Sequence, residues 1–68
     1  MKNLFKDNLK QLRTEAGLGQ VELAKRLGVS KGVISFWENG LREPSMSSLI
    51  TLSKFFKVTI DYLVGLEN

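Results

Sequence analysis

The 68-residue chain contains no cysteine and no histidine, and it has a single proline and a single tryptophan. Without cysteine it has neither a disulfide nor a thiolate nucleophile, and without histidine it lacks an imidazole base and the usual ligands of zinc. Its seven acidic residues are scattered along the sequence and form no catalytic cluster, and the sequence contains no glycine-rich loop of the kind that binds phosphate. We therefore expect a protein that is not an enzyme, with no cofactor and no metal site, stabilised by packing alone.

Long apolar runs are also missing. The longest uncharged stretch, residues 44–53, is rich in serine and too short to span a bilayer. The first residues lack the apolar core of a signal peptide. We expect one domain over residues 1–68 in a reducing, cytoplasmic setting, with no membrane contact and no small-molecule ligand.

Positive charge is concentrated in one part of the chain. The net charge is +3, but residues 1–57 hold all ten basic residues and carry +5, whereas residues 58–68 carry −2. A basic surface is typical of proteins that bind nucleic acid, and it is equally typical of a solvated face without any polyanionic partner. Charge alone leaves both interpretations open.

Helical periodicity and helix-end signals predict an all-α fold of five helices with short connections. The expected helices span about residues 4–16, 20–27, 31–39, 46–56 and 60–64. The expected N-caps are Asn3, Ser30, Ser45 and Thr59. Apolar residues at helical spacing are expected to face the core: Phe5, Leu9, Leu12 and Ala16; Leu23, Ala24 and Leu27; Val33, Ile34 and Trp37; Met46, Leu49, Leu52 and Phe56; Ile60, Leu63 and Val64.

The second and third expected helices have the spacing of a helix-turn-helix. Ala24 provides the small side chain that two steeply crossing helices need, and Gly28 tolerates the positive φ at which the first of them ends. Ile34 is the apolar anchor on the second. This geometry leaves one side of the helix over residues 31–39 free to enter a DNA major groove.

The free side of that helix has an unusual composition for a solvated surface. It is expected to consist of Lys31, Gly32, Ser35, Phe36 and Asn39, with one charge, one helix-weakening glycine and one bare phenyl ring. Gly32 permits close approach of a backbone, and Phe36 can meet a thymine methyl group. Lys31 and Ser35 can donate hydrogen bonds to base edges or phosphates.

Two alternatives remain open on this side. Phe36 can instead fold back against Leu41 or Met46 as a satellite of the core. Ser35 can bond back to its own helix.

Motifs along most of the chain carry a family resemblance: QVELAKRLGVS at residues 20–30, ISFWENG at 34–40, REPS at 42–45 and DYLVG at 61–65. From about Leu9 to Gly65 the chain resembles the Xre/Cro/CI-like family of repressor DNA-binding domains. The resemblance implies a lambda-repressor-like fold and a sequence-specific, DNA-binding transcriptional regulator, expected to be a repressor of prophage or bacterial type. It further implies that a homodimer binds a pseudo-palindromic operator in double-stranded DNA, with one recognition helix per half-site.

The resemblance also implies roles for individual residues. Positions matching Lys31, Gly32 and Phe36 read base edges, and positions matching Gln20, Asn39 and Arg42 contact the phosphate backbone. Arg13 and Glu38 are expected to form an ion pair between the first helix and the end of the third, although Arg13 can alternatively be a free, phosphate-seeking cation. We treat this pair as orienting the recognition helix more than stabilising the fold.

The chain departs from the family pattern at three positions. Gly19 replaces the usual Ser or Thr before Gln20, so only half of the capping box with Glu22 can form. Gly32 and Phe36 replace residues that form hydrogen bonds in relatives, so recognition here is expected to depend more on DNA shape and phosphate contacts.

A dimer interface is expected near the C-terminal helices, where Phe55, Val58, Tyr62 and Leu66 are the candidates. Ordinary edge packing is the alternative for these four. A second class of function also stays open, a protein-interaction module such as an antitoxin or an anti-repressor target that uses the outer side of the third helix. Gly32 and Phe36 favour it, whereas Arg42 and the basic residues 1–57 favour DNA.

Overall fold

The computed structural model describes residues 4–66, and these form five helices and no strand. The helices are α1 (Phe5–Glu15), α2 (Gln20–Leu27), α3 (Lys31–Glu38), α4 (Met46–Phe56) and α5 (Ile60–Val64). The expected all-α class is confirmed. Compared with the prediction, α1 begins one residue later and ends one residue earlier, and α3 ends one residue earlier.

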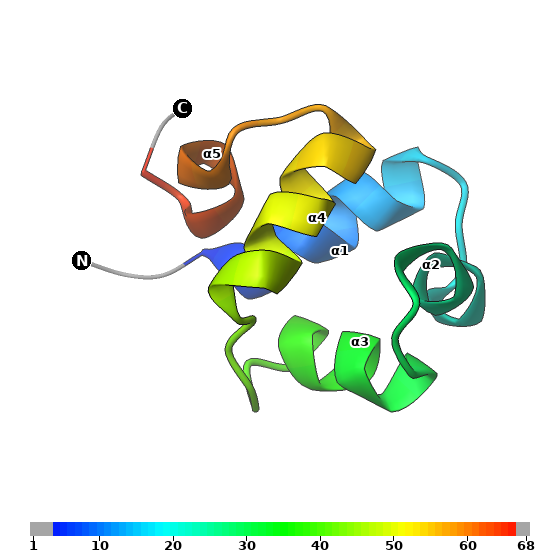
Figure 1. Cartoon of the computed structure of the whole chain (residues 1–68). Helices are drawn as coiled ribbons and strands as arrows, with labels where there is room; N and C mark the ends of the chain where they lie inside the picture. Colours follow the sequence, from blue (N-terminus) through cyan, green and yellow to red (C-terminus); the bar gives the residue numbers. More distant parts are fainter. Residues whose placement is uncertain (1–3, 67–68) are drawn as a thin grey trace.

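Helix α1 joins two pairs of helices. It lies between α3 and α5 and contacts both, while α2 packs on α3 and α4 packs on α5 (Figure 1). Backbone and side-chain hydrogen bonds attach α1 to α5: the Leu4 amide donates to the Val64 carbonyl, and Asn8 Nδ2 donates to the Tyr62 carbonyl at 2.9 Å. The α2–α3 pair is therefore carried on one side of a scaffold made by α1, α4 and α5.

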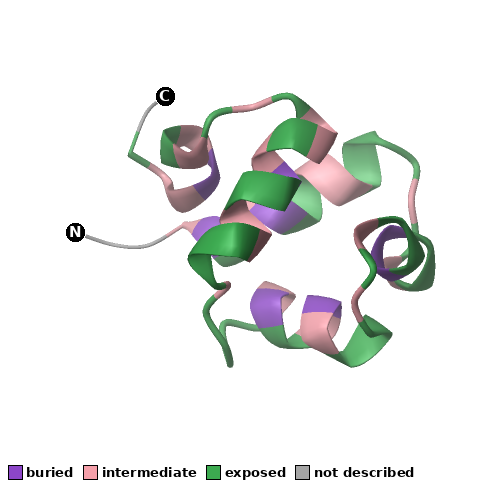
Figure 2. Cartoon of the chain, viewed as in Figure 1, coloured by how far each residue is buried: buried purple, intermediate pink, exposed green. Residues whose placement is uncertain are grey.

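Every helix contributes to one buried cluster. Figure 2 shows the buried side of α3 turned toward the rest of the molecule. The cluster consists of Phe5, Leu9, Leu23, Ala24, Ile34, Trp37, Leu52 and Leu63. Phe5 and Trp37 meet edge to face, with ring centroids 6.1 Å apart, which links α1 to the inner side of α3.

Two of the residues expected on buried faces are exposed, and several are half-buried. Ala16 is exposed because α1 ends at Glu15 and Ala16 is only its C-cap. Leu27, the last residue of α2, is half-buried, and Met46 is 67% exposed. Met46 is the first residue of α4 and extends beyond the cluster, so its helical spacing alone gave a wrong prediction for it.

Side-chain caps fix where the later helices begin. The hydroxyls of Ser30, Ser45 and Thr59 accept hydrogen bonds from the amides of Val33, Ser48 and Tyr62 at 3.0–3.2 Å. Asn3 lies outside the described residues, and Leu4 occupies the N-cap position of α1. At α2 the Gly19 amide donates to Glu22 Oε1 at 3.0 Å, which is the half of the capping box that a glycine permits.

The turn between α2 and α3 depends on Gly28. Its φ is +73°, in the left-handed region where a side chain is strained. The following Val29 amide donates back to the Ala24 carbonyl at 3.0 Å, which closes the end of α2. With Ala24 buried under this turn, α3 starts at Lys31 in a fixed direction relative to α2.

Candidate nucleic-acid interface

The outer side of α3 is open to solvent in the part of the chain that the structure describes. Ile34 and Trp37 are buried on its inner side, and the outer residues Lys31, Gly32, Phe36 and Asn39 are exposed, with Ser35 half-buried. The helix is thus anchored by one side and free on the other. This is the geometry that insertion into a groove requires.

Gly32 has no steric role within the chain. A Cβ built on it would meet only Ser30 Oγ, at 3.8 Å, and its φ is not among the positive values that the structure contains. An alanine would fit and would favour the helix by up to about 1 kcal/mol. Packing among the described residues therefore gives no reason for a glycine at this position.

Phe36 lies outside the core cluster. The residue is 42% exposed, and the guanidinium of Arg42 lies over its ring, with Cζ 5.3 Å from the ring centroid. Leu41 and Met46, the alternative partners considered for Phe36, are themselves exposed. Phe36 is thus presented on the surface together with a cation.

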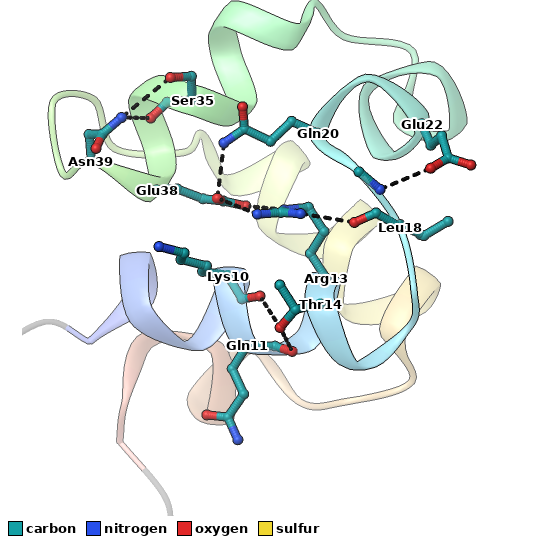
Figure 3. Close-up of polar contacts among 11 residues, drawn as sticks. Lys10, Gln11, Arg13, Thr14, Leu18, Gln20, Glu22, Ser35, Glu38 and Asn39 are labelled. Atoms are coloured by element: carbon teal, nitrogen blue, oxygen red, sulfur yellow. Dashed lines mark hydrogen bonds and ion pairs between the residues drawn. The ribbon is translucent and has the colours of Figure 1, made fainter.

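A polar network holds the three N-terminal helices together (Figure 3). Arg13 Nε and Nη2 donate to the two carboxylate oxygens of Glu38, at 2.6 and 3.0 Å, and Arg13 Nη1 donates to the Leu18 carbonyl at 2.8 Å. Gln20 Nε2 donates to Glu38 Oε1 at 3.1 Å. The ion pair expected between α1 and the end of α3 is present, and Arg13 is not a free cation.

The network is largely removed from water, with the Arg13 and Glu38 side chains 11% and 4% exposed. Burial by itself raises the pKa of Glu38, but hydrogen bonds from Arg13 and Gln20 and the charges of Arg13 and Lys10 outweigh it, and the pKa of this carboxyl is lowered. The hydrogen bond to Glu38 raises the pKa of Arg13. Both groups are therefore charged at neutral pH.

Two expected phosphate-binding side chains are already engaged within the chain. Gln20 uses one hydrogen of its amide group on Glu38, which leaves the second hydrogen for another acceptor. Asn39 Nδ2 donates to the carbonyl and to Oγ of Ser35, at 2.8 and 3.3 Å. Asn39 must therefore rotate before it can bind a phosphate, and Ser35 is tied to its own helix.

Lys6 is a cation near the site that sequence reasoning did not single out. Together with Asn39, Gly40 and Arg42 it lines a shallow hollow between the start of α1 and the loop after α3. A Cβ on Gly40 would lie 3.3 Å from Lys6 Cδ. The only sequence signal for Lys6 is its position four residues before Lys10, on the same side of α1. The charge of Lys10 itself contributes to the lowered pKa of Glu38.

The four residues expected at a dimer interface are not equally available. Phe55 and Val58 are partly buried against the core, and Phe55 also packs edge to face on Phe56. Tyr62 is half-buried beside Val58, whereas Leu66 is 55% exposed. Phe55 and Val58 thus bury part of their surface within the chain itself, and Leu66 is the most exposed of the four candidates.

Other kinds of site find no support in residues 4–66. None of the five helices combines the length and the hydropathy needed to cross a bilayer. Over the same residues, acidic side chains do not gather in a group able to hold a metal ion.

Comparison with known proteins identifies the family. A model of a family described as helix-turn-helix matches residues 9–63. The chain belongs to this helix-turn-helix family. The matched residues include α2, α3 and the turn between them, which confirms the motif predicted from the sequence.

Similar helix-turn-helix proteins include regulators of different lengths. The chain is 51% identical over 64 residues to the HTH-type transcriptional activator BcrR of Enterococcus faecalis, covering 94% of this chain and 31% of BcrR. It is 41% identical to the uncharacterized HTH-type transcriptional regulator MJ0272 of Methanocaldococcus jannaschii, covering 94% of this chain and 97% of that one. A crystal structure of the P22 c2 repressor protein in complex with a synthetic operator is 32% identical, with a TM-score of 0.88, covering 97% of this chain and all of that one.

The structural similarity to the P22 c2 repressor confirms the expected lambda-repressor-like fold. The chain spans between about a third and just over half the length of the first curated relatives that it matches.

Proposed function

We propose that this helix-turn-helix chain is a DNA-binding transcriptional regulator that places the outer side of α3 in the major groove. The observation that carries the proposal is the anchored inner side of α3 combined with its open outer side. The P22 c2 repressor, which has the same fold, was crystallised with its operator. We place its action in the cytoplasm, where the DNA of bacterial and archaeal cells lies.

The proposed contacts fall into two groups. Lys31, Gly32, Ser35 and Phe36 face the base edges, and Ser35 is the most restricted of them because of Asn39. Lys31 can donate to a neighbouring phosphate as well as to a base edge. The phosphate-binding group consists of Gln20 through its second amide hydrogen, Arg42, Asn39 after rotation, and Lys6 from α1. Phosphate contacts set the register, and base contacts select the sequence.

A dimer on a twofold-symmetric site is the second part of the proposal. One recognition helix covers too few base pairs for selectivity, and a twofold partner repeats the contact about 34 Å further along the duplex. Relatives include both an activator and repressors, and we propose repression as the direction by similarity to the phage repressors RstR and C2. Selection from a random duplex library tests the proposal, since the enriched sites are expected to show twofold symmetry.

Replacing Lys31 or Arg42 with alanine is expected to weaken DNA binding and to reduce its dependence on salt. Each cation that no longer neutralises a phosphate removes about 0.9 from the slope of log K against log salt. The measurement is fluorescence anisotropy with the enriched duplex at several salt concentrations, with Lys54→Ala on α4 as the control. Unchanged slopes in both variants would reject these two contacts.

Leu66→Lys is expected to weaken binding to a duplex with two half-sites by about 10-fold and to leave binding to a single half-site unchanged. A charge at a buried apolar interface costs more than 1 kcal/mol, which corresponds to about this factor. Ile50→Lys, at an exposed apolar residue of α4, is the matched control. Equal affinities of wild type and Leu66→Lys on the double site would remove Leu66 from the interface.

Exposed apolar side chains favour one second candidate, a protein-docking module. Phe36 and Leu41 both lie exposed beside Arg42. Retention on random-sequence DNA at low salt distinguishes the two, because a docking module without DNA affinity elutes with the void volume.

A further inference from the structure

The contact between Arg42 and Phe36 is produced by the path of the chain after α3. The Leu41 amide donates to the Phe36 carbonyl at 2.9 Å, and Gly40 has a φ of +72°, so the chain folds back along the last turn of α3. Arg42 is thereby carried over the ring, with Cζ 5.3 Å from its centroid. The path of the backbone after α3 thus places Arg42 within reach of the Phe36 ring.

The guanidinium over Phe36 keeps its hydrogen-bonding groups available. Among residues 4–66 Arg42 forms no ion pair, and no hydrogen bond involves its side chain. Contact with a ring does not use the five N–H donors of a guanidinium, and among residues 4–66 those of Arg42 have no acceptor. Arg42 can therefore bind a DNA phosphate without leaving the ring.

A phenyl ring held in this way can recognise one kind of group in the major groove. Base pairs display hydrogen-bond donors and acceptors there, and the only apolar group is the C5 methyl of thymine. A ring placed against donors or acceptors leaves them unsatisfied, which is costly. Gly32 lies one turn before Phe36 on the same exposed side and has no Cβ to keep the base away.

We infer that Arg42 and Phe36 form a single reading unit for a 5-methylpyrimidine. Phe36 contacts the methyl group, and Arg42 is a positioning residue that fixes the ring while it binds the neighbouring phosphate. The inference rests on the proposed function. If Arg42 only bound a phosphate, its loss would lower the affinity for all sequences alike. In the proposed unit, the preference for a methylated base also depends on Arg42.

The test uses the enriched duplex with deoxyuridine replacing thymine at one position at a time, which removes only the methyl group. For the wild-type protein we expect one position in each half-site where this replacement weakens binding about 3- to 10-fold, as expected for one partly buried methyl group. In Phe36→Ala the thymine-to-deoxyuridine ratio at that position falls to about 1. Comparing 5-methylcytosine with cytosine at that position measures the effect of the methyl group on a different pyrimidine ring.

Arg42→Lys is the decisive variant because it retains the charge but not the planar stacking surface. We expect its salt slope to equal that of the wild type while the methyl discrimination is lost. Arg26→Lys, the same substitution at an exposed arginine of α2, is the matched control and should retain the discrimination. Full methyl discrimination in Arg42→Lys, or no methyl-sensitive position in the wild type, would overturn the inference. Failure of the wild type to bind any duplex would instead overturn the proposed function.

Discussion

Gly32→Glu is expected to lower affinity for the enriched DNA duplex at least 100-fold without unfolding the protein. The new carboxylate lies on the exposed side of α3, where a Cβ has room, and an acidic residue in the first turn of a helix is favourable. In the complex the same carboxylate faces phosphates and base edges, and like charges in an interface cost several kcal/mol. Anisotropy gives the affinity, and urea unfolding monitored by circular dichroism verifies the fold.

Two variants make this result interpretable. Ser47→Glu introduces the same charge at the second residue of α4, the position that Gly32 has in α3, and should change DNA affinity by no more than a few-fold. Gly32→Ala should raise the free energy of unfolding by up to about 1 kcal/mol and still weaken DNA binding. Strong DNA binding by Gly32→Glu would show that another surface contacts the duplex.

Glu38→Ala is expected to reduce the free energy of unfolding at neutral pH by about 3 kcal/mol, a large part of the stability of so small a domain. The substitution leaves the Arg13 guanidinium buried without its carboxylate partner and removes the acceptor of the Gln20 amide. The difference from wild type should shrink in acid. Because folding lowers the pKa of Glu38, its stabilisation is present above the unfolded-state pKa of about 4.3 and is lost as the pH falls through the lower folded-state pKa.

The measurement is urea unfolding of both proteins between pH 7 and pH 3. A difference that stays constant across this range would show that the charge on Glu38 does not stabilise the fold. Removing both charges in Arg13→Met/Glu38→Met should restore most of the stability, because no buried charge is left unpaired. If the network orients α3, this double variant still binds DNA more weakly than the wild type, since Gln20 has lost its anchor.

The sequence predicted the fold well because local signals agreed with tertiary packing. Helix-end signals such as Ser30 and Gly28 act within a few residues of where they occur, so they located the turn between α2 and α3 correctly. The errors occur at helix ends, where spacing does not show how far the core extends. Met46 continues the apolar pattern of α4 but lies beyond the buried cluster.

The candidate site was predictable where it lies on a single helix and less so where separate segments meet. The open side of α3 follows from periodicity alone. The contact of Arg42 with Phe36 and the position of Lys6 beside Gly40 depend on how the loop and α1 pack, and no spacing in the sequence encodes that. The family resemblance suggested the pairing of Arg13 with Glu38, but it did not include the bond from Gln20.

Amide NMR spectra of the chain, recorded while the enriched duplex is added, test most directly whether the outer side of α3 contacts DNA. We predict that the largest shifts belong to Lys31, Gly32 and Phe36 and extend to Gln20 and Arg42, while Thr51 and Lys54 on α4 change little. Large shifts confined to α4 and α5, with the α3 signals unmoved, would contradict this prediction.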